Sequence, residues 1–190
     1  MASFAESTYL RGVNGSVAAV DTGNLLRINP KSDFQRAVED GRAFAWAAVD
    51  ENQDIGDTLL ALENNSTEFL LCIQTIAISI AAAGGSVCPV FTAKGITVAG
   101  STAVVGTNLN RNSAFSCVPL CTCVTEETGN GEAASSWPYR MYMPQVLTTT
   151  PYIINVDGAI RLPYDHMLGV DSIQEPTSEA VTFIGWFEPI

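Results

Sequence analysis

Apolar residues gather in short runs along the chain, and the strongest signal is the stretch from Asp57 to Ile80. The run Leu59–Leu62 is followed by the polar residues 64–67, Asn-Asn-Ser-Thr, and then by a longer apolar run that begins at Phe69. Asparagine tolerates left-handed backbone angles at low cost. The pattern therefore predicts two strands joined as a hairpin by a short polar turn.

The longer run changes its pattern part-way along. From Phe69 to Ile73 both parities are apolar, whereas from Ile76 to Ile80 isoleucine alternates with alanine and serine. Such a strand is expected to be buried on both faces at its start and on one face at its end. The change of parity near Gln74 predicts a β-bulge, because one extra residue moves the following side chains to the opposite face.

The rest of the chain continues as short β-prone runs separated by Gly, Asn, Pro and Ser, at residues 43–49, 87–93, 115–125, 150–162, 166–170 and 180–188. Pro89 has no amide hydrogen, so its run is expected to lie at a sheet edge or to begin at the proline. The alternation between Gly95 and Gly106 predicts a further hairpin. Residues 33–39 are compatible with a turn of helix capped by Ser32 or Asp33.

This arrangement of strands predicts an all-β protein, an antiparallel β-sandwich, and favours a jelly roll at a length of 190 residues. Residues 1–42 lack sustained periodicity, apart from a short strand expected at 25–28, and are expected to form an extended N-terminal arm. Residues 43–190 are expected to form the sandwich. Two interpretations of the arm remain open: a loosely packed segment, or an arm that crosses to a neighbouring subunit.

Composition narrows the function classes. The net charge is −11, from 20 acidic and 9 basic residues, which argues against neutralisation of nucleic-acid phosphates and against an anionic membrane surface. Charged residues make up only 15% of the chain, so either the surface is rich in uncharged polar residues or another chain covers part of it. We expect neither a signal peptide nor a membrane span, and a soluble protein made in the cytoplasm.

The sequence offers no catalytic constellation. His166 is the only histidine, and the adjacent Asp165 would point to the other face of an extended segment. The Gly-x-Ser-x-Gly and phosphate-binding glycine motifs are absent. We therefore predict that the protein is not an enzyme, with no catalytic residue and no cofactor.

The five cysteines lie at positions 72, 88, 117, 121 and 123, each in an apolar run. Their spacing does not match the two short pairs that a structural zinc site typically uses. Buried free thiols are the favoured interpretation, since such a thiol behaves as a small hydrophobe. A disulfide and a metal site stay open as alternatives, although Cys121 and Cys123 are expected to share one strand face.

Two weaker features complete the candidate chemistry. Asp50, Asn52 and Asp54 imitate the start of an EF-hand loop, but Ile55 occupies the position that requires glycine. We predict no metal site there, and leave open a looser calcium site that includes Asp57. A second feature is a set of aromatic residues that could form a carbohydrate-binding surface or simply pack, namely Trp137, Tyr139 and Tyr142.

The order of these features resembles a group of tailed-bacteriophage virion proteins. The resemblance is carried by the early strand AFAW, by GDTLLALENNSTEFLLCIQTIAIS, and by the closing HMLGVDSIQEPTSEAVTFIGWFE. It spans roughly residues 43–188 as a pattern of strands and turns, and the cysteine-rich segment 115–125 is not part of it. The resemblance implies a jelly roll that decorates or cements a capsid, or that forms its fibres.

Together these observations favour a viral structural protein that stabilises a phage head as a capsid decoration or cement protein. Its expected partners are the major capsid protein and further copies of itself, as a homotrimer or homodimer, with no nucleic acid and no membrane. Its expected location is the capsid surface of the virion, after synthesis in the host cytoplasm. The alternative is a fibre or spike module that binds a receptor or carbohydrate.

Overall fold

The computed structural model describes residues 19–20, 26–27, 31–50, 58–81, 86–95, 98, 102–125, 139–142, 145–146, 150–171 and 178–190. The chain divides into two compact units, Met1–Ser32 and Asp33–Ile190. In the first unit, β1 (Ala19–Val20) pairs antiparallel with β2 (Leu26–Arg27), and β2 lies within the short strand expected at 25–28. Of the rest of the predicted arm, residues 31–42 are described and include a short helix, and the remaining residues lie outside the described part.

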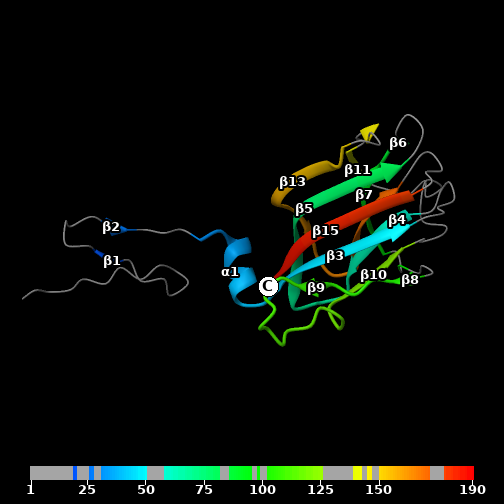
Figure 1. Ribbon diagram of the computed structural model, residues 1–190. Helices are drawn as coiled ribbons and strands as arrows, with labels where there is room; N and C mark the ends of the chain where they lie inside the picture. The colour runs from blue at the N-terminus through cyan, green and yellow to red at the C-terminus, as the bar shows by residue number, and fades with distance from the viewer. Residues whose placement is uncertain are drawn as a thin grey trace, which may run out of the picture. The chain divides into compact units, whose positions relative to one another are not determined.

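The second unit is an all-β sandwich of two antiparallel sheets, as the sequence predicts (Figure 1). The five-stranded sheet has the order β13 (Tyr152–Leu162), β5 (Phe69–Ala81), β15 (Ser178–Pro189), β3 (Ala43–Asp50) and β9 (Thr107–Asn108). The six-stranded sheet has the order β11 (Tyr139–Tyr142), β7 (Val90–Lys94), β14 (His166–Asp171), β4 (Thr58–Asn64), β10 (Cys121–Thr125) and β8 (Thr102–Ala103). A separate pair joins β12 (Gln145–Val146) to β6 (Ser86–Val87).

The long strands pair in a nested order. The first, β3, pairs with the last, β15; β4 pairs with β14, β5 with β13, and β7 with β11. Successive strands β3, β4, β5 and β7 also alternate between the two sheets. The chain is therefore wrapped as a double ribbon, which brings the two ends of the sandwich sequence into adjacent strands.

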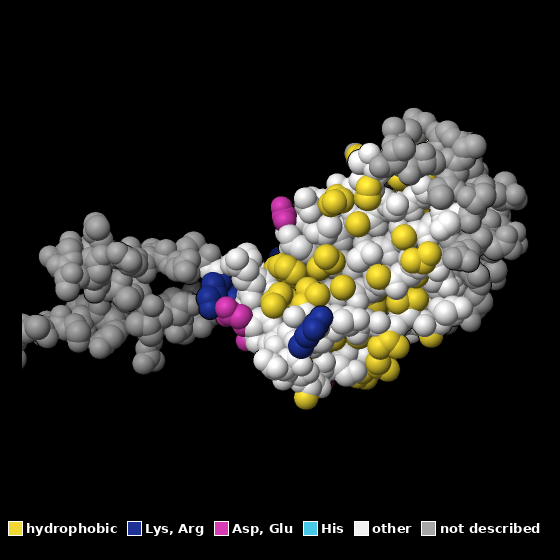
Figure 2. All heavy atoms as spheres, viewed as in Figure 1, with side chains coloured by type: hydrophobic (Ala, Val, Ile, Leu, Met, Phe, Trp, Pro, Cys, Tyr) yellow, Lys and Arg dark blue, Asp and Glu magenta, His cyan; other side chains and the backbone are white. Residues whose placement is uncertain are grey.

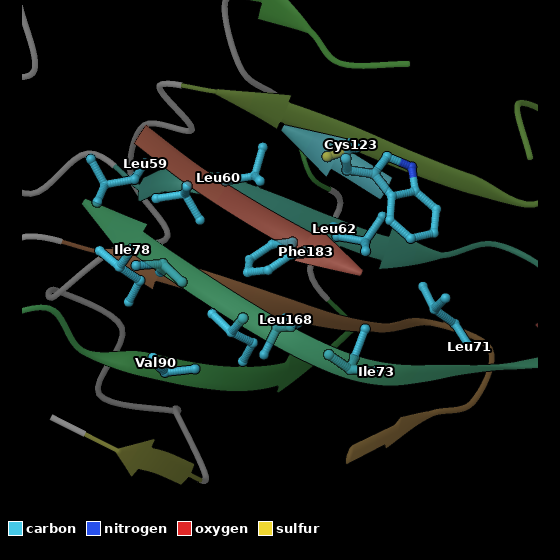
Figure 3. Close-up of a cluster of buried hydrophobic side chains, with 14 of the residues drawn as sticks. Leu59, Leu60, Leu62, Leu71, Ile73, Ile78, Val90, Cys123, Leu168 and Phe183 are labelled. Atoms are coloured by element: carbon cyan, nitrogen blue, oxygen red, sulfur yellow. The ribbon is translucent and has the colours of Figure 1, made fainter. Parts of the chain in front are cut away.

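The core fills the space between the two sheets (Figure 3). Inward side chains of the five-stranded sheet, such as Trp46 and Phe183, face Leu60, Leu62 and Leu168 of the six-stranded sheet, and all of these are fully buried. Burying each such side chain stabilises the fold by about 1.5–3 kcal/mol. This energy determines which side of each strand faces the core.

The prediction for β5 is confirmed in detail. Residues 71–73 are all buried, whereas from Ile76 onward only every second residue is buried. On β15, Ile184 pairs with Thr75 and the next residue, Gly185, pairs with Ile73, so Gln74 is the extra residue of a bulge. On the other side of β5, the strand β13 bulges at the same level, where Asp157 and Gly158 have positive φ. The bulge reverses which parity faces the core.

The predicted hairpin around residues 64–67 is wrong. β4 and β5 are consecutive but belong to different sheets, so the turn crosses from one layer of the sandwich to the other. The buried amide of Asn64 holds this crossing: its nitrogen donates to the carbonyls of Phe69 at 2.9 Å and Leu162 at 2.8 Å, and its oxygen accepts from Ser66 N at 3.0 Å. All seven residues of β4 are buried, as a central strand requires.

The run 87–93 is expected to lie at a sheet edge or to begin at its proline, and the second alternative is confirmed. β7 begins directly after Pro89 and lies between β11 and β14. Of the hairpin expected between Gly95 and Gly106, the described residues hold the strand β8, which pairs with β10, and residues 96–97 and 99–101 lie outside the described part. The next strand, β9, begins beyond Gly106 and belongs to the other sheet. Turn residues mark where the chain bends, but they do not determine which sheet receives the next strand.

Helix α1 (Asp33–Glu39) forms where the sequence allows a turn of helix, directly after Ser32. Its Phe34 ring lies 5.7 Å from the Trp186 ring, and its Ala37 packs in a cluster with Ala43 and Trp186. The helix therefore covers one end of the outer face of the five-stranded sheet. The compact unit that holds the sandwich accordingly begins at Asp33, earlier than the Ala43 start expected from the sequence.

Candidate functional site

The candidate site is the part of the five-stranded sheet's outer face that α1 leaves uncovered. The strand registers arrange the outward side chains in rows across four strands, which we call the uncharged face. Its rows are Val49–Ala180–Ser79, Ala47–Thr182–Ala77–Ile153 and Ala45–Ile184–Thr75–Asn155. No position in these rows carries a charge, although the chain has a net charge of −11.

The uncharged face is open to solvent. Val49 is 67% exposed and Ile153 is 60% exposed, while Ala180, Thr182 and Ile184 are half-buried by their neighbours. Figure 2 shows hydrophobic side chains interspersed with uncharged polar side chains and backbone over β3, β15 and β5, with the charged side chains at the margins. Lone exposed apolar residues are ordinary, but a contiguous set on one sheet face is typical of an interaction surface.

Charged side chains bound this face at its helical end. The Gln74 amide donates to Asp157 at 2.5 Å, and Arg161 pairs with Glu188 at 3.5 Å. An apolar centre with a polar margin is the usual composition of a protein–protein contact.

A groove adjoins the uncharged face along β3. β9 pairs with β3 only at Phe44 and Ala45, so among the described strands the rest of β3 has a partner only on its β15 side. Facing it is β8, the outer strand of the six-stranded sheet. The hollow between them has a volume of about 400 Å³ and is lined by Ala47, Ala48, Val49, Thr102, Ala103, Val104, Val105 and Thr125. Unpaired strand edges of this kind are sites where further chains add.

The cysteines lie in three places within the sandwich, and all five are buried and none forms a disulfide. Cys121 and Cys123 both face the core, as their shared parity predicts, and Cys117 packs in the same core cluster. The Cys121 thiol donates to the Cys117 carbonyl at 3.4 Å, and Cys117 donates to the Gly106 carbonyl at 3.8 Å. Among the described residues, no group of three His, Cys, Asp or Glu side chains is placed to hold a metal ion.

These contacts divide the thiols into two chemical classes. A hydrogen bond from the Cys121 side chain lowers the pKa of Cys117 to about 7, although burial opposes the shift. Burial raises the pKa of Cys72 and of Cys88 to about 12, and it also raises the pKa of Cys123. Cys117 is therefore the most acidic thiol of the five.

His166 opens β14, where it pairs with Asn64 on one side and Lys94 on the other. Its ring Nδ1 lies 3.0 Å from the carbonyl of Tyr164. The adjacent Asp165 has a φ of 64° and is a turn residue, with its amide donating to Asn64 O at 2.9 Å. The backbone, not the adjacent carboxylate, is therefore the partner found for the ring.

Several sequence candidates lie outside the described residues: Asn52, Asp54 and Asp57 of the acidic turn, the loop 126–136 and Trp137. Asp50, Tyr139 and Tyr142 are placed in strands, but the positions of their side chains are not described. Sequence reasoning missed both the uncharged face and its groove. The available signal was the lack of charge on the outward parity of three segments, 43–49, 69–81 and 178–186.

No protein-family model matches the chain, and no match was found among curated proteins or among solved structures. No helix in the described part of the chain is long and apolar enough to cross a membrane.

Proposed function

We propose that the protein is a structural component of a virus particle, a decoration or cement protein that stabilises a phage head by contacts with the capsid and with its own copies. The observation that carries the proposal is the uncharged face with its open strand edge, on a chain with a net charge of −11. Covering a surface of this kind with another chain removes apolar area from water, which lowers the free energy of the assembly.

The nested pairing of the long strands supports a jelly-roll sandwich, in which two packed sheets are built from eight main strands. The extra strands β8, β9 and β10 add to the edges at β3 and β4. A rigid double layer of this kind suits a shell component, because such a component holds subunits together and needs no conformational change.

The stabilisation would act by mass action. A protein that binds the assembled shell, and not the separated capsid subunits, shifts the equilibrium towards the shell by an amount that grows with its concentration. In this role no residue acts as a catalyst and no cofactor is used. The partners are the major capsid protein and a homodimer or homotrimer of the chain, on the outer capsid surface of particles assembled in the host cytoplasm.

The test is a binding experiment on particles stripped of the protein. Purified protein should bind again at fixed stoichiometry and raise the temperature at which the capsids open. A cryo-EM map of the native particle should then place the sandwich on the shell. If the protein neither returns to stripped capsids nor occupies the shell in the map, the proposal is refuted.

The second candidate function is a fibre or spike module that recognises a receptor or carbohydrate. It is favoured by the aromatic residues Trp137, Tyr139 and Tyr142, which follow one another closely in the sequence. Loss of host adsorption after Trp137→Ala, with capsid stability unchanged, would favour this function over the first.

A further inference from the structure

We propose that the uncharged face is the contact between two copies of this chain, packed sheet on sheet about a two-fold axis that runs parallel to the strands. This assignment rests on the proposed role as a shell component, and it names the partner that covers the face. The capsid itself would then be contacted by other surfaces of the protein.

Charge favours a second copy as the occupant. Each copy carries a net charge of −11, so two copies repel one another wherever carboxylates approach. The rows of the uncharged face are free of that repulsion. A cationic partner would gain no attraction from the same rows, since they offer no carboxylate to pair with.

The sizes of the side chains favour the direction of the axis. A two-fold axis parallel to the strands, midway between β5 and β15, places β3 of one copy over β13 of the other, and β15 over β5. Ile153 then stands over Ala47 in the second row, and Ile184 over Thr75 in the third. Each large side chain meets a small one, as close packing requires.

The other in-plane axis, perpendicular to the strands, fits less well. It would place Ile153 of one copy directly over Ile153 of the other, and Thr182 over Thr182. Large side chains would then meet at the β13 edge while small ones left gaps at the β3 edge. The parallel axis is therefore the one that the row pattern supports.

The extent of the face indicates how strong the contact should be. With strands about 4.8 Å apart and a rise of about 3.4 Å per residue, four strands and three rows cover roughly 400 Å². A stable protein–protein contact buries about 800 Å² on each partner. We therefore expect a weak pairing that becomes effective when copies are held close together on a shell.

The experiment uses the full-length chain and two single variants, Ala47→Glu and Ile153→Lys, analysed by sedimentation equilibrium. Both positions are exposed, so each variant should fold, which far-UV circular dichroism and thermal melting verify. The wild type should form dimers. Each variant alone should lose self-association by at least 100-fold, because it would bury an unpaired charge against an apolar side chain.

An equimolar mixture of the two variants should recover association to within about 10-fold of the wild type. In the mixed dimer, Glu at 47 faces Lys at 153, while the second pair of positions keeps the native residues. Val118→Lys, in the exposed loop before β10, is the matched control and should leave association unchanged.

The outcomes are decisive in each direction. A wild type that stays monomeric up to millimolar concentration, single variants that associate normally, or a mixture without recovery would overturn the inference. The capsid-binding test separates this inference from the proposed function: monomers that bind stripped capsids refute only the dimer contact, and dimers that bind no capsid refute only the capsid role.

Discussion

At the scale of single residues, the chemistry of this protein lies in side chains whose burial changes their acidity. Glu63 lies in β4, and Cys117 lies in the loop before β10. The pKa of Glu63 is raised and the pKa of Cys117 is lowered. Burial dominates for the carboxyl group, whereas a hydrogen bond from a neighbouring thiol dominates for the cysteine. Each shift leads to a measurable prediction.

Burial raises the pKa of Glu63, and the hydrogen bond that its carboxylate accepts from Val98 N at 3.3 Å offsets this only in part. A raised pKa means that the folded protein holds this proton more tightly than the unfolded chain. Its contribution therefore makes the protein more stable as pH falls towards the ordinary carboxyl range, and less stable as pH rises through the folded-state pKa.

We expect Glu63→Gln to stabilise the protein at pH 8 by up to about 1 kcal/mol, because the amide can still accept from Val98 without the cost of a buried charge. The gain should shrink by pH 5, measured by urea denaturation at both values. Glu68→Gln, at an exposed position in the following turn, is the control substitution. A variant that is less stable than the wild type at both pH values would contradict the assignment.

Cys117 should be the first thiol to be alkylated in the folded protein, because its pKa is about 7 while burial raises those of Cys72 and Cys88 to about 12. Iodoacetamide at pH 8 with peptide mass spectrometry gives the order of labelling. Labelling should be slow, since Cys117 is 1% exposed, and all five cysteines should react together in denaturant. Preferential labelling of Cys88 or Cys123 would contradict the expected order.

At the scale of elements, the crossing between β4 and β5 depends on one buried amide. Asn64 satisfies two carbonyls and one amide hydrogen that come from three different segments of the chain. The neighbouring Asn65 is exposed, and its side chain donates to the hydroxyl of Thr122 at 2.7 Å, while its backbone amide donates to the Leu120 carbonyl at 2.9 Å. The two asparagines are adjacent in sequence and differ in what they hold together.

We therefore expect Asn64→Ala to lower the free energy of unfolding by about 2–4 kcal/mol, since buried polar groups lose their partners. Asn65→Ala should cost no more than about 0.5 kcal/mol, because its hydrogen bond is exposed to water. Equilibrium urea unfolding of the two variants side by side measures the contrast. Equal effects from the two substitutions would show that the amide of Asn64 does not hold the crossing.

The bulge at Gln74 is the other element on which the fold depends. Gly185 lies opposite it on β15, and a Cβ atom there would come within 2.6 Å of the backbone carbonyl oxygen of Cys72. The absence of a side chain at Gly185 lets the two strands stay close while the parity of β5 changes. The same parity change leaves Thr75, Ala77 and Ser79 on the outer face, so the bulge determines the composition of the uncharged face.

At the scale of the whole molecule, the charge distribution predicts how association responds to salt. Two copies with a net charge of −11 repel, while the uncharged face offers no ion pairs to be screened. Raising the salt concentration from 50 to 500 mM should therefore tighten self-association several-fold. Sedimentation equilibrium at both concentrations measures it, and a contact that weakens with salt would point to ion pairs elsewhere.

The sequence determined where the long strands run, where the parity of β5 changes, and that the protein is an all-β sandwich. It overstated the strand expected over 115–125, which covers only Cys121–Thr125. These features follow from local patterns, because the alternation of apolar residues records the faces on which each segment is buried. The composition also showed that the chain has few charged residues, but not which part of the surface is uncharged. The tertiary structure alone decided that β4 and β5 lie in different sheets, and that β13, β5, β15 and β3 are neighbours.

The physical reason is that strands pair through backbone hydrogen bonds, which are much alike whatever the side chains, so the sequence of one strand does not name its partner. The uncharged face exists only once four strands from distant parts of the chain stand side by side. The run AFAWAAV is apolar on both parities, so the sequence shows that neither of its faces carries a charge. Only the fold shows that one of these faces packs into the core and that the other is exposed.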